Sequence, residues 1–494
     1  MRTALPALLL LLLLLMPVAA PAQSYSLYGD LRGGVLYDYL PESAEAQQLS
    51  SLAAIQAHHR LSFELLEFSA VQSLTWLGGA YAGLLQASLP AELQPLVGGA
   101  LPLHRIDTVS AELYLGGSAA VSLGKQRMSW GTARSFTPSD VMHPDGPLPT
   151  ATEGFTGVSG NLTLGTGVLL AAGVSLDQAL AADSASASGS EGARADPFWR
   201  DLRYAARSSI LLFRNLELTP SVVYQEERSL RPGLGASMSA GPLLFFAEGA
   251  GEFHNPYYYP VAETDAQAAS TLERGGPDDP RWVATAGVEW SPRFGPVTAT
   301  LGAEYLYNGL GYSAAEREDL YLLVRTLRPE APVPPPTGIS ALLGGAGFGP
   351  GSGITAGAGS SGAETAGDGT GDPTAPGASE AVAALAAAPP TGSVAGTAHP
   401  LGLPPLLGRH YAIPTLSLEI AGYVTVSSRG LVNLTDGSVL GQHGVTITPA
   451  SSFDIDLVAS WAAGRAYESE LGTFPGEQLP PGRVRGGAFV TIHF

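Results

Sequence analysis

Apolar and polar residues alternate along many stretches of this chain, and its final segment shows the pattern clearly. In the stretch RVRGGAFVTIHF, residues 483–494, apolar residues share one parity and polar residues share the other, with Phe489 as the exception. A period of two is typical of a β-strand with one apolar and one polar face. The pattern therefore predicts a strand that ends at Phe494.

The same alternation recurs throughout the chain. Residues 25–39 alternate without interruption, over a longer stretch than the roughly 5–6 residues of a typical strand in a globular sheet. Aromatic residues recur near the strand ends, where the two interfaces of a membrane barrel place them. Strand length and aromatic ends both favour strands that cross a bilayer at a tilt. Further alternating stretches lie at 202–212, 216–225, 282–290, 297–305 and 453–461.

The connections between these stretches fall into two classes. Short turns on one side and long loops on the other are typical of an outer-membrane β-barrel. A soluble all-β sandwich would also alternate, but with shorter strands and without this asymmetry. We therefore predict a transmembrane antiparallel β-barrel. The short connections are 115–118, 165–167, 214–215 and 239–242, and the long ones are 131–153, 177–200, 254–280, 309–408 and 464–482.

The strand number depends on residues 41–106. The stretch RLSFELLEF, residues 60–68, is interpreted as one strand, and residues 70–99 supply either a further strand with a loop helix or no strand. We expect about 14–16 strands, with an even total because the chain crosses in and out. The last strand closes against the first, because hydrocarbon does not tolerate an unpaired sheet edge.

The amino-terminus predicts export from the cytoplasm. Arg2 precedes an apolar run at 8–15 and an Ala-Pro-Ala site before Gln23. This arrangement predicts a secretory signal peptide at 1–22, because the apolar run is too short to span a bilayer as a retained anchor. The chain contains no cysteine, which excludes disulfide and thiolate chemistry in the oxidising space that it enters.

A segment of unusual composition separates two parts of the predicted barrel. Residues 330–400 consist mainly of Gly, Ala, Pro, Ser and Thr, and such a segment buries too little apolar surface to offset its ordering entropy. We predict a disordered loop there, on the extracellular side, between barrel parts at 23–329 and 401–494. The formal net charge of −19 argues against nucleic acid as a partner, because phosphate binding requires a basic face.

The stretch LGKQRMSWGTARSFTPSDVMHP, residues 123–144, has the most distinctive sequence. A strand that ends in Trp130 and Gly131 and continues into a proline-containing turn can fold inward and narrow the barrel. The alternative is a tryptophan of the aromatic belt with a loop that caps its own strand. Strict alternation points Lys125 outward and Gln126 inward, whereas a bulge at Gly124 would reverse both.

This stretch resembles a porin-like family of bacterial outer-membrane barrels, most of them without an assigned substrate. These barrels carry a Gly-Arg-Gln-x-x-x-Trp-Gly strand end followed by Asn/Thr-Pro-x-Asp and Asn-Pro. Lysine stands at 125, where the family more often has arginine, so the bidentate geometry of arginine is lost. The segments 433–438 and 464–472 also resemble the closing region of that family. The matching positions are Gly124, Lys125, Gln126, Trp130, Gly131, Thr137, Pro138, Asp140 and Pro144.

The resemblance implies a bacterial outer-membrane barrel that passes small solutes, with Gln126, Trp130, Pro138 and Asp140 as candidate constriction residues. Barrels of this membrane typically end on an amphipathic strand with a terminal aromatic residue that the barrel-assembly machinery recognises. Phe494 matches that assembly signal. The implied partners are therefore outer-membrane lipid, lipopolysaccharide, the assembly machinery and small solutes.

Charged residues on the polar strand faces are candidates for the pore lining. Arg32 on the first strand and the arginines of the last strand become neighbours when the barrel closes, and acidic residues could face them. Opposed basic and acidic walls set a transverse field in porins. A salt-bridged interior that only stabilises the barrel is the alternative. The candidates are Asp30, Arg32, Arg203, Arg207, Glu217, Glu289, Glu304, Arg483 and Arg485, with His493 beside the arginines of the last strand and with Asp454 and Asp456 among the acidic residues that could face them.

Catalytic motifs are not found in the sequence. The nine histidines lie outside any Gly-x-Ser-x-Gly or His-Glu-x-x-His pattern, so we expect no enzyme, cofactor or metal site. We expect a passive porin in the bacterial outer membrane. The alternative is a non-transporting surface barrel, such as an adhesin, that acts through the 309–408 loop. An energy-coupled receptor is disfavoured, because no plug domain precedes the first strand.

Overall fold

The protein is described by a computed structural model that carries all 494 residues. The residues described here are 24–39, 48–79, 100–126, 131–135, 137–138, 155–177, 202–226, 229–253, 258–261, 271–274, 280–313, 315–317, 319, 408–464 and 484–494. Within these ranges, no helix is long and apolar enough to span a membrane.

Nearly all of the described residues belong to one antiparallel sheet. This sheet has 19 strands, and the two-residue β15 (Arg293–Phe294) pairs only with β16 inside a turn, so 18 strands form the wall. The wall strands are β1 (Ser24–Tyr39), β2 (Gln48–Ser62), β3 (Leu66–Gly79), β4 (Ala100–Tyr114), β5 (Ala119–Gln126), β6 (Phe155–Leu164), β7 (Val168–Ser175), β8 (Arg203–Leu212), β9 (Leu216–Gln225), β10 (Ser229–Ala240), β11 (Leu243–Glu252), β14 (Arg281–Trp290), β16 (Val297–Asn308), β17 (His410–Ile420), β18 (Val424–Asn433), β19 (Val439–Ala450), β20 (Phe453–Ala463) and β21 (Val484–His493).

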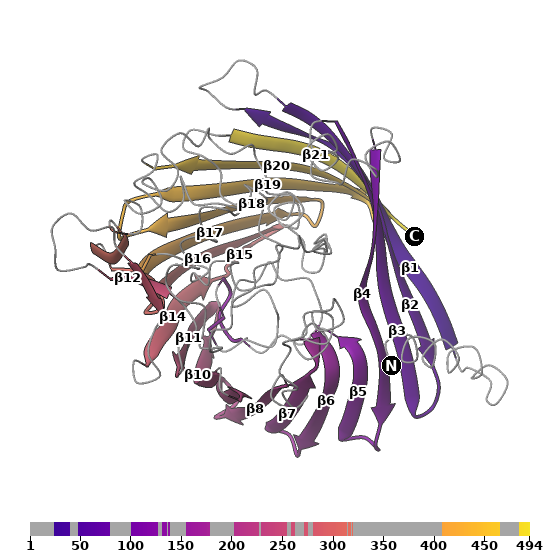
Figure 1. Ribbon diagram of the computed structural model, residues 1–494. Coiled ribbons are helices and arrows are strands. Elements are labelled where there is room, and N and C mark those ends of the chain that lie inside the picture. The colour runs from indigo at the N-terminus through magenta and orange to yellow at the C-terminus, as the bar shows by residue number, and fades with distance from the viewer. Residues whose placement is uncertain are drawn as a thin grey trace, which may run out of the picture.

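The sheet closes on itself, as the sequence predicts. Each wall strand pairs with the next one along the chain, and β1 pairs with β21 from Asp30↔His493 to Tyr39↔Val484. Phe494 extends this pairing, because its N–H donates to the Gly29 carbonyl at 2.9 Å and its own carbonyl accepts from the Gly29 N–H at 2.8 Å. Figure 1 shows the indigo β1 beside the yellow β21. The strands therefore form a closed barrel.

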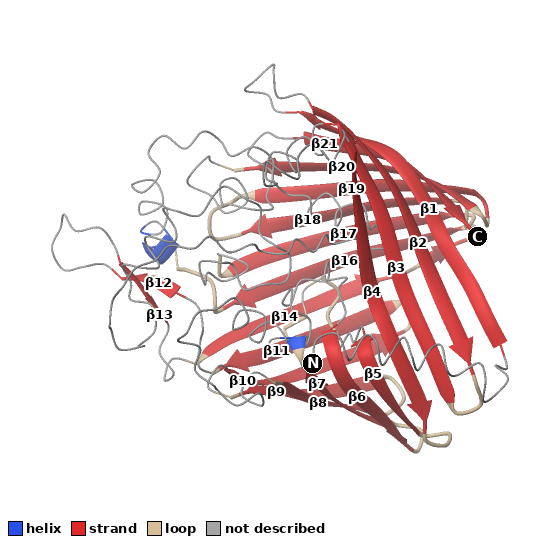
Figure 2. Ribbon diagram, turned by 45° about the vertical axis from the view of Figure 1, so that its right-hand side comes forward, coloured by secondary structure: helices blue, strands red, loops and turns tan. Residues whose placement is uncertain are grey.

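The two ends of the barrel differ in their connections. The end that carries Ser24 and Phe494 has short turns, at 63–65, 115–118, 165–167, 213–215, 241–242, 291–296, 421–423 and 451–452. The opposite end, called the loop end here, carries the long connections together with two short ones at 226–228 and 434–438. A separate hairpin of β12 (Tyr258–Val261) and β13 (Thr271–Arg274) lies beyond the wall at the loop end (Figure 2). The predicted asymmetry of short and long connections is confirmed.

The predicted barrel is confirmed, but the expected number of 14–16 strands is too low. Residues 41–106 hold β2, β3 and the first part of β4. The stretch RLSFELLEF is the hairpin between β2 and β3, and the Phe63 N–H donates to the Leu66 carbonyl at 2.8 Å across the turn. Neither glycine nor proline marks this turn, and its Leu65 is exposed like an outward strand residue. The alternating pattern therefore hides the turn.

The outer face of the wall is apolar between two belts of aromatic residues. Outward side chains such as Leu123, Leu301 and Leu457 are exposed, whereas inward positions carry buried polar groups such as Thr285 and Gln56. This inside-out distribution is typical of a barrel that crosses a lipid bilayer. The exposed belt residues are Tyr37, Tyr204, Tyr224, Trp282 and Trp461 towards the loop end, and Tyr25, Trp290, Phe294, Tyr423 and Phe494 at the turn end.

His443 is a polar residue on the outer face whose ring is paired with neighbouring strands. The Trp461 indole N–H donates to Nε2 of His443 at 2.9 Å, and Nδ1 of the same ring lies 3.0 Å from the Ser428 hydroxyl. An indole is only a donor, so Nε2 is the acceptor, and Nδ1 carries the proton that is donated to Ser428. Both ring nitrogens of this outward histidine are thus paired, as a group facing hydrocarbon requires.

Phe489 breaks the alternation of the last strand because it faces the lumen. Its side chain is 1% exposed, and the Arg32 guanidinium lies 4.5 Å from the ring centroid. The ring lies against Gly34 of β1, where an added Cβ would come within 2.3 Å of the Phe489 ring. Gly33, the preceding residue, has open space around its Cβ position. Closure of the barrel therefore depends on glycine at 34 and not on glycine at 33.

We predict that Gly34→Val prevents tight closure, whereas Gly33→Val does not. Overpacking typically costs about 1–3 kcal/mol, and the clash at Gly34 involves both the Phe489 ring and the Ala488 carbonyl. Heat-modifiable mobility on SDS gels measures the temperature at which the purified barrel unfolds. Equal unfolding temperatures for the two variants would contradict this account of the seam between β1 and β21.

Candidate functional site

The segment 131–138, called the strap here, leaves the wall after β5 and binds the wall at β11. The Glu248 carboxylate of β11 accepts hydrogen bonds from the Thr132 N–H at 2.7 Å, the Thr132 hydroxyl at 3.1 Å and the Ala133 N–H at 3.1 Å. Strands β6 to β10 separate β5 from β11 around the wall. The strap therefore crosses the interior of the barrel and does not cap its own strand.

A second carboxylate holds the strap two strands further along. Glu304 of β16 accepts from the Ser135 N–H at 3.0 Å and from the Thr285 hydroxyl at 2.8 Å. The Arg429 guanidinium of β18 donates to the Ser135 carbonyl at 3.3 Å. Glu248, Thr285 and Glu304 are all buried. Hydrogen bonds to ionised groups are stronger than neutral ones, so these contacts hold the strap firmly. Glu248 and Arg429 lie near the middle of β11 and β18, which places the strap at mid-height in the lumen.

Two glycines allow the strap to lie this close. A Cβ at Gly131 would come within 2.1 Å of the Thr137 side chain, so the strap folds tightly upon itself only with glycine there. A Cβ at Gly235 of β10 would lie 2.7 Å from the Thr132 hydroxyl, so the strap rests directly on the backbone of that strand. Ala133, Ser135, Thr137 and Pro138 are buried as a result.

Arg134 is the charged side chain of the strap that faces open space. Its guanidinium Nε lies 3.5 Å from Glu289 of β14, and the side chain is 58% exposed. Glu289 lies nearer the turn end than Gly287, the residue that pairs with Glu304. Arg134 therefore extends from the strap towards the turn end, with an acidic residue on the wall beside it.

The opposite part of the wall carries a cavity. Its volume is about 540 Å³, and its lining includes Gln126, Arg207 and Glu217 on the inner faces of β5, β8 and β9. The strap therefore lies against the inner face of β11 to β18, and the polar cavity lies against the inner face of β3 to β9.

The inward orientation of Gln126 agrees with strict alternation. Gln126 is buried, and its Oε1 accepts from the Ser159 hydroxyl at 2.8 Å. Lys125 lies on the other face, where its Nζ donates to the Ile106 carbonyl at 3.0 Å. The register of β5 against β4 is continuous through Gly124. The irregularity in this region lies in β4, opposite Val71 and Gln72 of β3.

The predicted charges at the seam between β1 and β21 lie side by side. Arg32 pairs with Asp456 at 3.4 Å, and His493 contacts both Asp30 and Asp454, the latter at 2.8 Å. Asp30 lies on the same strand as Arg32, and Asp454 and Asp456 lie on β20, separated from β1 only by β21, so none of them faces Arg32 across the lumen. The seam therefore has the salt-bridged arrangement that the sequence left open as the alternative.

The other predicted residues lie in different parts of the barrel. Arg207 and Glu217 line the cavity, whereas Glu289 and Glu304 contact the strap. Arg203 lies within electrostatic reach of Glu252. Trp130, Asp140 and Arg483 lie outside the described residues, and Arg485 is described only by its backbone pairing with Asp38.

Sequence reasoning missed Glu248, Arg231, Glu252 and Arg429. Arg231 and Glu252 form an ion pair at 3.1 Å in which both side chains are more than nine-tenths buried. Each of the four residues is a charged residue at an inward position of a strand that carries few charges. That inward parity is the signal that could have identified them.

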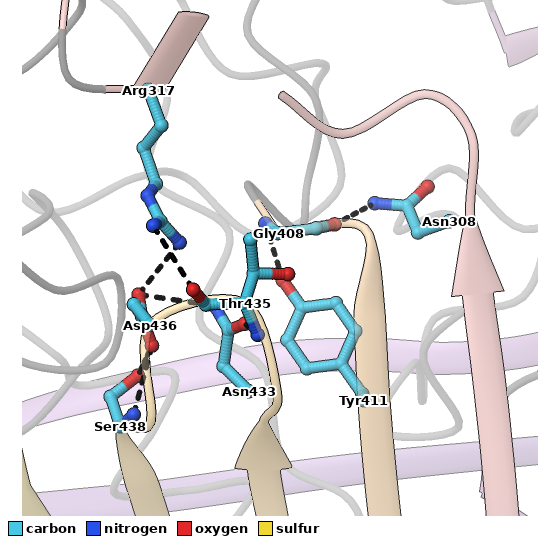
Figure 3. Close-up of polar contacts among 8 residues, drawn as sticks. All are labelled: Asn308, Arg317, Gly408, Tyr411, Asn433, Thr435, Asp436 and Ser438. Carbon is cyan, nitrogen blue, oxygen red and sulfur yellow. Dashed lines mark hydrogen bonds and ion pairs between the residues drawn. The ribbon is translucent and has the colours of Figure 1, made fainter. Parts of the chain in front are cut away.

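A second polar cluster fixes the loop end of the wall. Arg317, in a short helical turn after β16, pairs with Asp436 at 3.1 Å, and both side chains are buried. Asp436 also accepts from the Ser438 N–H and hydroxyl, at 2.8 and 2.6 Å. Figure 3 shows Arg317 pointing into the 433–438 turn, with Gly408 held between Asn308 and Tyr411. The turn at 433–438 thus binds Arg317, which belongs to the connection between β16 and β17.

Aromatic residues extend this cluster to the β12–β13 hairpin. The Tyr259 hydroxyl donates to the Leu310 carbonyl at 2.9 Å, and its ring packs edge to face against Tyr312. Burial raises the pKa of the Tyr312 phenol, so this hydroxyl stays neutral at any physiological pH. The Arg281 guanidinium lies 4.4 Å from the Tyr259 ring centroid. The hairpin is thereby attached to the wall beneath it.

These features define a membrane-spanning antiparallel barrel with a segment anchored across its lumen. Solved structures with a similar fold include Acinetobacter baumannii OccAB1, at 10% identity over 96% of this chain and 98% of that chain, with a TM-score of 0.48. The outer membrane protein OprD from Pseudomonas aeruginosa has 8% identity over 96% and 95% of the two chains, with a TM-score of 0.45.

Pseudomonas aeruginosa OccK2 (OpdF), solved in complex with glucuronate, has 11% identity over 96% and 98% of the two chains, with a TM-score of 0.45. No protein-family model matches this chain, and no curated protein matches it. We therefore infer the function of this chain from its own residues.

Replacement of Glu248 by alanine should release the strap and raise the single-channel current. Hydrogen bonds to charged groups contribute about 1.5–3 kcal/mol each, so loss of the two backbone bonds weakens the anchor by about 3–6 kcal/mol. Glu248→Gln is the matched control, because its amide oxygen still accepts from the strap. Currents in planar bilayers that are unchanged in Glu248→Ala would show that the strap is held by other contacts.

Proposed function

We propose that the protein is a passive channel for small polar solutes in the outer membrane of a bacterium. The observation that carries this proposal is the strap, which buried carboxylates hold across the lumen beside a polar cavity. Barrels of 16–18 strands leave an aqueous interior. A strap fixed across the lumen narrows such an interior, which is the architecture of a selective pore.

The charge arrangement supports selection of the solutes that pass. Arg134 and Glu289 place opposite charges side by side at the narrowed level. Charged side chains at a constriction act on a solute at short range, where water screens them least. Passage would therefore depend on the charge of the solute as well as on its size.

The outer surface supports insertion into this membrane. The apolar band between two aromatic belts matches a bilayer. The partners that we propose are outer-membrane lipid, lipopolysaccharide at the loop end, and the barrel-assembly machinery, with Phe494 as the residue that the machinery recognises. The alternative of a non-transporting surface barrel assigns the activity to 309–408, and residues 320–407 lie outside the described part of the chain.

Purified protein should produce discrete single-channel current steps in planar bilayers. The proposed route for ions is the lumen between the strap and the β3–β9 wall, so steps should appear without ligand and without an energy source. The absence of steps at every voltage, in protein whose heat-modifiable mobility shows a folded barrel, would exclude the channel.

Arg134→Glu should shift the ion selectivity towards cations. The substitution replaces the exposed positive charge of the strap by a negative one beside Glu289, so anions meet greater repulsion. The reversal potential under a potassium chloride gradient measures this shift, and Arg134→Lys is the control that keeps the charge. An unchanged reversal potential in Arg134→Glu would place the selective region elsewhere in the lumen.

A further inference from the structure

The cavity along β3 to β9 is lined mainly by neutral hydrogen-bonding side chains. They come from β3, β4, β5, β6 and β8 and surround a volume of about 540 Å³, which falls within the range of roughly 300–1,000 Å³ found for small-molecule sites. The neutral polar residues are Ser69, Thr108, Ser110, Ser122, Gln126, Ser159, Asn161 and Ser209.

Strand register gathers these hydroxyl groups into one surface. Ser122 of β5 pairs with Ser159 of β6 on one side and with Glu112 of β4 on the other. The three residues therefore lie side by side across three neighbouring strands. The Ser69 and Ser110 hydroxyls are 2.9 Å apart. Each hydroxyl both donates and accepts, so the surface can pair with hydroxyl groups of a solute in either direction.

Gln126 provides an independent sign of a missing polar partner. Its side chain is 8% exposed, and Ser159 donates to its Oε1 at 2.8 Å, which orients the amide. The amide nitrogen is buried without an acceptor among the described residues. A buried donor left unpaired is destabilising. An oxygen atom of a solute in this cavity would satisfy it.

The charges around the cavity do not favour an anion. Arg207 contributes one positive charge, whereas Glu112 and Glu217 contribute two negative charges, so the lining sums to −1. Both carboxylates already accept a hydrogen bond, Glu217 from Ser209 at 2.5 Å and Glu112 from Tyr114 at 3.1 Å. Leu169 and Ala171 supply an apolar patch between the polar rows. An uncharged solute with hydroxyl groups and C–H faces fits this lining best.

We propose that this cavity is a binding site for a neutral, polyhydroxylated solute of monosaccharide size, through which such solutes are selected during passage. The proposal rests on the channel function and names its substrate class. Binding exchanges the solute's hydrogen bonds to water for bonds to serine, asparagine and glutamine side chains, and places its C–H groups on Leu169 and Ala171.

The test uses three pyranose sugars that differ mainly in charge: D-glucose, D-glucuronate and D-glucosamine. Each is added to single channels of the full protein in planar bilayers, and the half-blocking concentration is measured. D-glucose should block the current at the lowest concentration. Strongest block by D-glucuronate would overturn the proposal in favour of an anion site at Arg207, and strongest block by D-glucosamine would overturn it in favour of a cation site at the carboxylates.

Substitutions locate the site. Ser122→Ala with Ser159→Ala removes two hydroxyls, and since each hydrogen bond is worth about 0.5–1.5 kcal/mol, the half-blocking concentration of D-glucose should rise about tenfold. Asn161→Ala provides a second, independent variant that should raise it in the same direction. Ser417→Ala with Ser427→Ala is the matched control, because these serines lie on inward positions of β17 and β18 outside the cavity.

The outcomes separate this inference from the channel function. A channel that conducts ions but is not blocked by D-glucose overturns the inference and leaves the channel function standing. Equal half-blocking concentrations in wild type and in both cavity variants overturn the location of the site. Absence of any current in folded protein overturns the channel function itself.

Discussion

Hydrogen bonding between the backbones of β1 and β21 is the interaction on which the rest of the structure depends. A sheet edge cannot remain unpaired in hydrocarbon, so every other feature requires that the first and last strands meet in one register. Gly34 receives the Phe489 ring, Arg32 covers that ring, and Asp456 neutralises the arginine. The seam is thus an interior contact of apolar, cationic and acidic groups, which fixes the register more firmly than backbone pairing alone.

Carboxylates inside the barrel take the role that a neighbouring strand has in the wall. Among the described residues, the strap pairs with no strand, so its N–H groups need acceptors within the lumen, and Glu248 and Glu304 supply them. Arg429 binds a strap carbonyl and so satisfies the opposite kind of group. Buried acidic residues in this barrel therefore serve as fixed acceptors for irregular backbone, which is how non-helical chain is accommodated at membrane depth.

The fold could be predicted from the sequence because alternation, turn length and aromatic ends all depend on local pattern. The strand number could not, because the turn at Glu64 and Leu65 carries no glycine or proline and continues the apolar pattern. At the site, strict alternation indicated the inward direction of Gln126, but a bulge at Gly124 would have reversed it. The Trp-Gly and proline residues allowed either an inward fold or a loop that caps its own strand, so the sequence left both questions open. The partners of the strap did not follow, because pairing Thr132 with Glu248 requires the spatial positions of strands that are far apart in the chain. Asp454 and Asp456 were expected opposite Arg32, but strand order places them beside it.

The main chain of the strap makes most of its anchoring contacts, and this has an evolutionary consequence. Every residue except proline carries the N–H group that Glu248 and Glu304 bind, so the exposed side chain of Arg134 can be exchanged while the anchor persists. Ala133 and Ser135 have less freedom because they are buried, and Gly131 and Gly235 have less because an added Cβ would clash. Natural variation can therefore change which solutes pass by substitution at position 134, while the barrel that carries it stays the same.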